Sequence, residues 1–467
     1  MAAKELSPID VYVLLPKTNC KLCGEENCMA FATKIVNRVV GLELCPPLLE
    51  KQHASSLVKL QEMLRPAVKE IALGTGEGTV TIGGKLVMYR HQFAYFNPTA
   101  IAMDISDEAS DEEIKQRITA VQSLFYDYIG QRLKLDMIAL RCTSNDAKKF
   151  EAAARKISET TKLPMMLCSV NPDTMEAGLV AVGKARPLIY AATLGNWKEM
   201  AELALMYNCP LAVSAPGDLD MLASLSATLL EYGVEDLVLD PGTFPGKGVG
   251  QTLDNFTMLR RAACEEGNKT LAFPLIGTPI SVWSQTGRSA EEARWEESCL
   301  MSMLITRYAD LLVVHSADGW LVLPNLVLRQ NLYTDPRKPV SVDPALKAFG
   351  TTDQNSPLLC TTNFALTYYT VASDIEAAGV SCYMLVIDTE GISVESAVAG
   401  RKLTADKVAE SIKTFKASEK VNHKTLVIPG RAARLSGEIE EATGWTVLVG
   451  PMDSSGIPKF LQEKWKR

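Results

Sequence analysis

The sequence predicts an α/β protein with a small cysteine-rich N-terminal domain, a central (β/α)8 TIM barrel and a C-terminal Rossmann- or flavodoxin-like domain. Three observations support this prediction. Cysteines crowd near the start, eight strand-like segments alternate with helical ones over about 230 residues, and the same alternation resumes near the end. A chain of 467 residues is also long enough for about three domains. We place the domains at 1–60, 61–320 and 357–467, joined by a linker at 321–356 that is rich in Pro, Asn and Asp.

Composition and charge exclude several classes of protein. Hydrophobic residues make up 47% and charged residues 22% of the chain, which is typical of globular domains. The net charge of -7 argues against nucleic acid as a partner, because phosphate binding needs a basic face. No apolar run reaches the roughly 20 residues that cross a bilayer, and the N-terminus has no signal-peptide pattern. With 11 cysteines, an odd number, we expect a cytoplasmic protein in a reducing compartment rather than a disulfide framework.

The crowded cysteines form a candidate metal site with the spacing C-x2-C-x4-C-x16-C. The preceding segment predicts a short helix that Ser7 caps and Pro16 ends, and a second helix separates the third cysteine from the fourth. Three thiolates in one loop and a fourth beyond a helix can surround a [4Fe-4S] cluster. Zinc is the competing metal, although structural zinc sites more often use two short Cys knuckles or include His. The four residues are Cys20, Cys23, Cys28 and Cys45.

The middle of the chain contains eight strand-like segments, each followed by a helical or turn-rich stretch. Strands that enter through Pro or Gly and leave through Asp, Asn or Ser are typical of βα units, and eight units favour a closed barrel over an open sheet. The predicted strands lie at 100–106, 137–144, 164–170, 187–193, 210–216, 236–242, 270–277 and 311–316.

Polar residues end several of these strands, where a barrel has its functional mouth. They could bind a flat polar ligand such as a pterin, but Asp and Asn are also ordinary helix caps. A lone strand-end histidine such as His315 is more often a hydrogen-bonded structural residue. The candidates are Asp104, Arg141, Asn171, Asn196, Asp218, Asp240 and His315.

The last hundred residues predict four parallel strands with intervening helices. The strands PLLCTTN, SCYMLVID, KTLVIPG and WTVLVGP are followed by loops of small and hydroxyl residues. In an open parallel sheet, ligands bind outside the carboxyl ends of the strands. These loops can therefore bring backbone N–H groups close to a large flat ligand, although they can also be ordinary turns.

Taken together, PKTNCKLCGEENCMAFA, CPPLL, the barrel and the C-terminal unit resemble the large (gamma) subunit of the corrinoid iron–sulfur protein of the carbon monoxide dehydrogenase/acetyl-CoA synthase system. The segments VMYRHQFAYFNPTAIAMDIS and CPPLL look like the archaeal acetyl-CoA decarbonylase/synthase form, which implies an anaerobic setting. The resemblance covers essentially the whole chain. It implies that the four front cysteines hold a [4Fe-4S] cluster and that the C-terminal domain binds a corrinoid, a cobamide of the B12 type. We carry the corrinoid contacts over only to strand-end positions: Thr362, Asn363, Thr367, Thr370, Gly391, Ile392, Ser393, Gly430, Ala432, Gly450 and Pro451.

The resemblance also implies a function and partners. The expected function is a methyl carrier of the methyltransferase class. The cobalt accepts a methyl group from a methyltetrahydropterin, of the tetrahydrosarcinapterin or methanopterin type, and exchanges it with the nickel site of acetyl-CoA synthase, while the cluster reactivates oxidised cobalt. The expected partners are the smaller delta subunit, as a heterodimer, and the acetyl-CoA synthase and carbon monoxide dehydrogenase subunits. The C-terminal domain has no D-x-H-x-x-G motif, and its His423 lies outside that pattern, so we expect a corrinoid without histidine ligation.

Three alternatives remain open. The chain could be an iron–sulfur electron-transfer protein with a flavin in its C-terminal domain. It could be a barrel methyltransferase that binds the pterin at its own mouth, or a scaffold subunit whose barrel serves only for packing.

Overall fold

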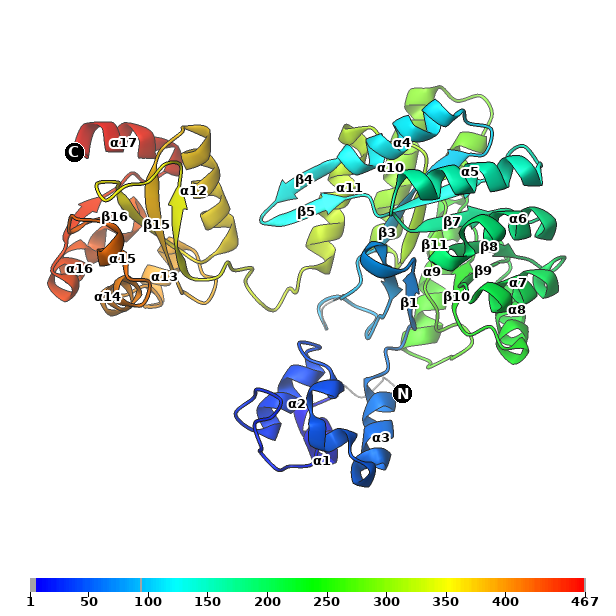
Figure 1. Cartoon of the computed structure of the whole chain (residues 1–467), viewed down its shortest axis with the longest axis horizontal. Helices are drawn as coiled ribbons and strands as arrows, with labels where there is room; N and C mark the ends of the chain where they lie inside the picture. The colour runs from blue at the N-terminus through cyan, green and yellow to red at the C-terminus, as the bar shows by residue number, and fades with distance from the viewer. Residues whose placement is uncertain (1–5, 93–94, 466–467) are drawn as a thin grey trace. The chain divides into compact units, whose positions relative to one another are not determined.

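The computed structural model describes residues 6–92 and 95–465, so the outer ends of the predicted first and last domains lie outside the described residues. The chain divides into two compact units (Figure 1). One unit comprises Met1–Tyr126 and Leu133–Tyr333, and the other comprises Asp127–Arg132 and Thr334–Arg467.

The N-terminal segment folds around the cysteine loop. Its helices are α1 (Pro8–Leu14), α2 (Cys28–Val36) and α3 (Ala54–Leu64). The predicted cap is confirmed as a capping box. The Ser7 hydroxyl accepts from the Asp10 backbone N–H, and the Asp10 carboxylate accepts from the Ser7 backbone N–H. A small apolar cluster that includes Cys28 and Cys45 joins these helices.

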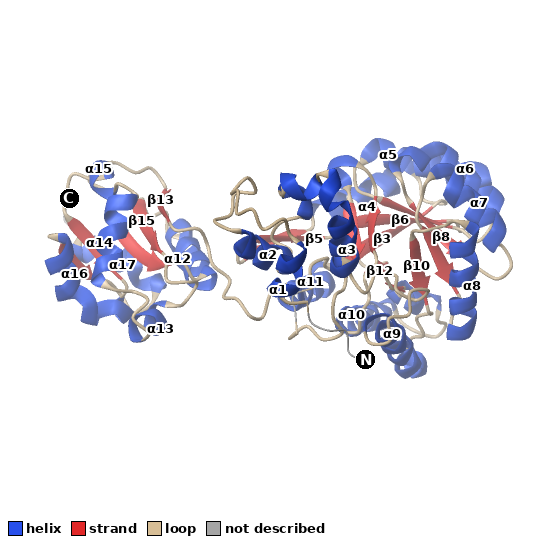
Figure 2. Cartoon of the chain, turned by 90° about the horizontal axis from the view of Figure 1, so that it is seen from below, coloured by secondary structure: helices blue, strands red, loops and turns tan. Residues whose placement is uncertain are grey.

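The predicted eight-stranded parallel barrel is confirmed. The strand order is β10-β9-β8-β7-β6-β3-β12-β11, and a parallel bridge between Leu239 and Leu275 closes the ring. Figure 2 shows the strands as a ring enclosed by helices. Nearly every strand residue is buried, as expected when side chains fill a barrel interior on one face and meet helices on the other. The strands are β3 (Ala100–Ser106), β6 (Met137–Arg141), β7 (Met165–Cys168), β8 (Leu188–Ala192), β9 (Leu211–Ser214), β10 (Leu237–Asp240), β11 (Ile276–Gly277) and β12 (Leu311–Val314).

Amphipathic helices cover the outside of the barrel. Most begin at a side-chain cap, such as Ser110, Asp146 and Ser289. The helices are α4 (Asp111–Ser123), α5 (Ala147–Thr160), α6 (Pro172–Val182), α7 (Trp197–Tyr207), α8 (Leu219–Tyr232), α9 (Val249–Cys264), α10 (Ala290–Thr306) and α11 (Gly319–Tyr333).

Two hairpins were missing from the sequence prediction. β1 (Glu70–Leu73) pairs with β2 (Val80–Gly83), and β4 (Phe125–Tyr128) pairs with β5 (Gln131–Lys134). The second hairpin replaces the end of a stretch that we expected to be amphipathic and helical. Its turn residues Ile129 and Gly130 both have positive φ, which gives the twist that a two-residue hairpin requires.

Two further predictions need correction. The predicted strand at 270–277 is reduced to two residues, because Pro274 has no N–H to donate to a ladder. The predicted linker at 321–356 contains most of α11 and all of the strand β13 (Ala345–Phe349). α11 buries an apolar face in spite of Pro324, and β13 pairs antiparallel with the C-terminal sheet.

The C-terminal sheet has the strand order β13-β15-β14-β16-β17. The four predicted strands are parallel: β14 (Leu358–Thr362), β15 (Cys382–Ile387), β16 (Thr425–Ile428) and β17 (Thr446–Val449). From β14 the chain proceeds to β15 on one side and then to β16 on the other, which is a flavodoxin-like order with its switch point between β14 and β16.

Helices cover both faces of this sheet, and each face has its own apolar core (Figure 1). The helices are α12 (Ala365–Ala377), α13 (Val394–Ala399), α14 (Ala405–Thr414), α15 (Ala417–Lys420), α16 (Ser436–Thr443) and α17 (Ile457–Lys464).

Candidate functional site

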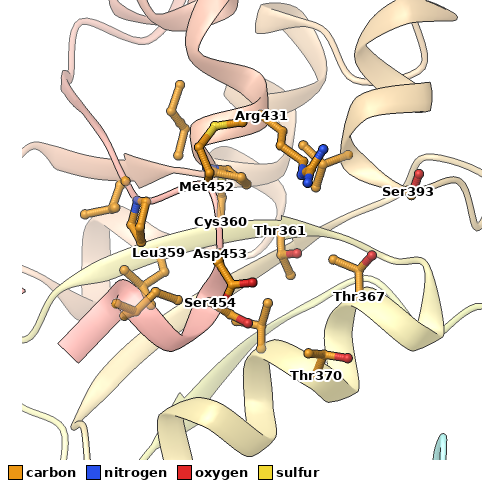
Figure 3. Close-up of a pocket in the computed structure, with 18 of the residues that line it drawn as sticks. Leu359, Cys360, Thr361, Thr367, Thr370, Ser393, Arg431, Met452, Asp453 and Ser454 are labelled. Atoms are coloured by element: carbon orange, nitrogen blue, oxygen red, sulfur yellow. The ribbon is translucent and has the colours of Figure 1, made fainter. Parts of the chain in front are cut away.

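A pocket of about 410 Å³ opens at the carboxyl ends of β14 and β16, at the topological switch point. Figure 3 shows Thr361 from β14, Thr367 and Thr370 from α12, and Arg431 and Met452 from the loops after β16 and β17 around one hollow. The floor and walls are largely apolar, with a few hydroxyls and one ion pair at the rim. This combination is typical of a cofactor pocket.

One polar group in this pocket has no protein partner. The Thr361 hydroxyl is buried, and it makes no hydrogen bond within the described chain. A buried hydroxyl without a partner costs free energy, so such groups usually meet a ligand or water. Thr361 therefore supplies a donor and an acceptor that a bound group can use.

Glycines let two loops of the pocket approach each other closely. A Cβ atom on Gly430 would lie 2.8 Å from the backbone carbon of Pro451, and one on Gly450 would lie 3.0 Å from the Ile428 oxygen. Backbone atoms cannot move aside as a flexible side chain can. These two positions therefore need glycine to keep the shape of this edge.

Gly430→Ala should lower the free energy of unfolding by about 1–3 kcal/mol. The matched control is Gly437→Ala in α16, where a Cβ meets nothing within 4 Å and alanine favours the helix. Chemical denaturation of both variants checks this. Equal stability of the two variants would contradict the prediction.

The structure brings together some of the predicted corrinoid contacts. Thr367, Thr370, Ser393, Gly450 and Pro451 line the pocket. Six others do not line it: Thr362, Asn363, Gly391, Ile392, Gly430 and Ala432.

Local structure explains where two of these side chains lie. Thr362 is fully buried, and the alternation of side chains along β14 directs it away from the face of Thr361. The Asn363 side chain is fully used: its oxygen accepts hydrogen bonds from the Thr389 and Gly391 N–H groups at 2.9 and 3.0 Å, and its amide donates to Asp388. Asn363 thus ties β14 to the loop after β15 instead of facing the pocket.

Sequence reasoning missed the charged rim of the pocket. Arg431 and Glu395 form an ion pair at 2.7 Å, and both side chains remain largely exposed. Asp453 lies beside them, and its hydrogen bonds with Ser455 and the nearby Arg431 charge hold its pKa below the usual range. These residues come from three separate segments, Glu395 from α13 and the other two from the segments after β16 and β17, so no local pattern could have grouped them.

His423 is held by the protein at both ring nitrogens. Nε2 donates to the Ser356 carbonyl at 2.9 Å, and Nδ1 accepts from the Thr425 N–H at 3.2 Å. The ring also packs against Trp465. His423 precedes β16, at the end of the strand opposite to the pocket. These contacts give it a structural role.

The cysteine loop has an unusual backbone. Lys17, Asn19, Lys21 and Gly24 all have positive φ, although three of them are not glycine. Left-handed positions change the direction in which backbone N–H groups point, and N–H groups that face one concavity bind anions at many iron–sulfur sites. Left-handed non-glycine residues cost about 1–3 kcal/mol each, so the surrounding contacts must stabilise this backbone.

The other three thiols of the candidate metal site affect the pKa of Cys45. Burial raises the pKa of Cys45, and the charges of Cys23, Cys28 and Cys20 raise it further. As the side chains stand, no group of three or more His, Cys, Asp or Glu among the described residues could hold a single metal ion.

A second pocket, of about 440 Å³, lies at the mouth of the barrel. Asp104, Arg141 and His315, three of the predicted mouth residues, line it together with Arg117 from α4. The Asp104 carboxylate lies 2.9 Å from Arg117 Nη2, 2.8 Å from Arg141 Nε and 2.7 Å from His315 Nδ1. Burial pushes the pKa of Asp104 up, but the hydrogen bond and charge of His315 and the two arginines outweigh it, so the pKa is lowered.

The other predicted mouth residues have structural roles. Asn171 and Asp218 cap α6 and α8, and Asn196 accepts from the Thr193 N–H and donates to the Val170 carbonyl. Asp240 is buried, where it accepts from Tyr190 and Ser214.

The carboxyls of Asp104 and Asp240 affect the pH dependence of the free energy of unfolding in opposite directions. Because the Asp104 pKa is lowered on folding, Asp104 stabilises the barrel above about pH 4, the unfolded value, and this stabilisation is lost as pH falls through the lower folded pKa. Asp104→Asn should therefore be less stable at pH 7 and show a flatter loss of stability in acid. Burial raises the pKa of Asp240. Asp240→Asn should therefore not flatten the loss of stability at acid pH. Denaturation curves between pH 7 and pH 2 check this, and a steeper acid limb in Asp104→Asn would contradict it.

The described part of the chain contains no helix long and apolar enough to cross a membrane. A family model for an Fe-S cluster matches residues 15–47, which contain all four front cysteines. A second model, described as CO dehydrogenase/acetyl-CoA synthase delta subunit, matches residues 70–461.

Whole-chain relatives agree with these matches. The acetyl-CoA decarbonylase/synthase complex subunit gamma of Methanothermobacter thermautotrophicus is 46% identical, over 98% of this chain and 99% of its own. Subunit gamma 2 of Methanosarcina thermophila is 44% identical, over 98% of each chain. Among solved structures, dihydropteroate synthase from Thermus thermophilus matches 56% of this chain and 100% of its own, with 16% identity and a TM-score of 0.39.

The fold and the cysteine loop define an iron–sulfur α/β protein with a closed barrel and an open-sheet domain. The relatives make the assignment specific. The chain belongs to the family of gamma subunits of the archaeal acetyl-CoA decarbonylase/synthase complex.

Proposed function

We propose that this chain is the corrinoid-bearing methyl carrier of its complex. When bound, the corrinoid supplies a cobalt that accepts a methyl group from a methyltetrahydropterin and exchanges it with the acetyl-CoA synthase nickel site. The chain would act as a methyltransferase within a complex that includes a smaller barrel subunit. The observation that carries the proposal is the pocket at the β14/β16 switch point, with its unpartnered Thr361 hydroxyl.

The size of this pocket fits one face of a corrin ring. A corrin with its amide side chains is larger than about 410 Å³, so the pocket can seat one face and leave the other exposed. Thr361 can bond the seated face, and Gly450 brings a loop backbone within reach of ring substituents. The other face would need cover from a partner, which supports the heterodimer.

The C-terminal domain offers no histidine to the cobalt. The only histidine of the C-terminal domain, His423, has both ring nitrogens engaged, at the far end of the sheet. A corrinoid bound here would therefore lack a strong protein ligand, which favours the reduced, nucleophilic cobalt. The cysteine loop can hold the [4Fe-4S] cluster that returns oxidised cobalt to that state.

The test is an anaerobic purification with the partner subunit, with metal analysis and visible spectra before and after a low-potential reductant. We expect about one cobalt and about four irons per chain, and a reduced-cobalt band after reduction. The flavodoxin-like strand order also suits a flavin. Iron with a flavin spectrum and no cobalt would replace this proposal with an electron-transfer function.

A further inference from the structure

His315 has the surroundings of a proton-transfer residue. It follows β12, and its Nδ1 lies 2.7 Å from a carboxylate oxygen of Asp104, 211 residues away in sequence. Asp104 is almost fully buried and its lowered pKa keeps it ionised, so it can only accept, and His315 Nδ1 must carry the hydrogen. This fixes the orientation of the ring, as in other carboxylate–histidine pairs.

The other ring nitrogen, Nε2, has no hydrogen-bond partner in the described part of the chain, and the ring lines the mouth pocket with about a third of its side chain exposed. The edge of Trp283 packs at 4.7 Å between ring centroids, which limits rotation of the imidazole. Two arginines and His315 thus share one buried carboxylate, and a pocket of about 440 Å³ lies open beside them. A merely structural histidine would use both nitrogens, as His423 does.

The titratable and charged groups around His315 come from several elements. Its backbone N–H donates to the Glu297 carboxylate of α10 at 2.6 Å, and its carbonyl accepts from Arg117 at 2.9 Å. The full set that faces this corner of the pocket is Asp104, Glu108, Glu113, Arg117, Arg141 and Glu297. Glu113 is occupied by its capping box with Ser110.

We propose that the barrel mouth binds the methylated tetrahydropterin and that His315 is the catalytic acid that protonates the leaving pterin nitrogen. The inference rests on the proposed function, since it names the place and the proton donor of that methyl transfer. Arg141 and Arg117 supply donors to carbonyl or carboxylate groups of the ligand, and Ser106 and Gln116 supply both donors and acceptors. A pterin ring presents both kinds of group along its edge.

The chemistry requires such an acid. When the methyl group leaves the pterin, the carbon–nitrogen bond breaks and its electron pair stays on nitrogen. The electron pair of the new bond to carbon would come from the reduced cobalt of the bound corrinoid. A secondary amine anion is a very poor leaving group, so the nitrogen must gain a proton as the bond breaks. His315 Nε2–H provides that proton, Asp104 stabilises the imidazolium through Nδ1–H, and water restores the proton afterwards.

The experiment compares two methyl donors in the holo complex purified with its partner subunit. For His315→Gln we expect single-turnover methyl transfer from methyltetrahydrosarcinapterin to fall by about 100-fold or more, with pterin affinity changed little. Methylation by methyl iodide, whose iodide leaves without a proton, should keep its wild-type rate.

Arg141→Gln tests the binding part independently, because it should raise the Kd for the pterin by about tenfold, measured by equilibrium binding. Asp218→Asn is the control at the same end of the barrel, since asparagine caps a helix as well as aspartate does. Wild-type rates in His315→Gln with both donors, or equal slowing with both, would overturn the role of His315. An unchanged Kd in Arg141→Gln would overturn the site. Either result leaves the corrinoid proposal intact, whereas a wild-type complex that methyl iodide cannot methylate would refute the methyl carrier itself.

Discussion

Cys45→Ala is expected to remove most of the iron from the purified chain and to unfold the cysteine-rich segment. Cys45 is buried in the small cluster of apolar residues that joins α1, α2 and α3. A segment with so few apolar residues depends on its metal, because ligand bonds replace the missing core. We expect iron to fall from about four per chain to near zero, measured by metal analysis with protease sensitivity of the segment as a second readout.

The control for this prediction is Cys299→Ser. Cys299 is partly exposed on α10, outside the cysteine loop, so its loss should leave the iron content unchanged. Cobalt content should be equal in both variants, because the proposed corrinoid pocket lies wholly in the C-terminal unit. Full iron in Cys45→Ala would remove Cys45 from the ligand set, and zinc in place of iron would refute the cluster assignment.

Local sequence signals predicted most of the elements. The capping box at Ser7, the eight buried strand runs and the alternation of the C-terminal unit each depend on residues within a few positions of one another. Such signals are strong when propensity, caps and burial agree. They also predicted that strand ends would carry polar groups near ligand sites, and the two pockets lie at such ends.

The missing parts depend on contacts that are distant in sequence. Nothing near His315 indicates its partnership with Asp104, which depends on the closure of the barrel between β12 and β3. The same holds for Arg117, a residue of α4 that reaches over the mouth. The edge strand β13 was predicted to be linker because the stretch around it is rich in Pro, Asn and Asp, and its pairing with β15 comes from residues more than 30 positions away.

Asp310→Asn should lower the free energy of unfolding of the barrel by about 3–5 kcal/mol. Asp310 is buried just before β12, where its carboxylate lies 2.6 Å from Arg260 Nη2 and 3.4 Å from Lys85 Nζ. It also accepts from the Leu275 N–H at 2.9 Å, beside the bridge that closes the barrel. Lys85 and Arg260 are almost fully buried, so asparagine would leave two cations without a countercharge in a medium of low dielectric constant.

The size of this effect comes from burial rather than from the ion pair alone. Lys85 keeps bonds to the Asn97 carbonyl and the Tyr333 hydroxyl, but these neutral groups do not cancel its charge. The control is Glu151→Gln, which breaks the exposed pair with Arg155 on α5 and should cost only about 0.3–0.5 kcal/mol. Urea denaturation of both variants separates the two cases. A loss below about 1 kcal/mol in Asp310→Asn would contradict the prediction.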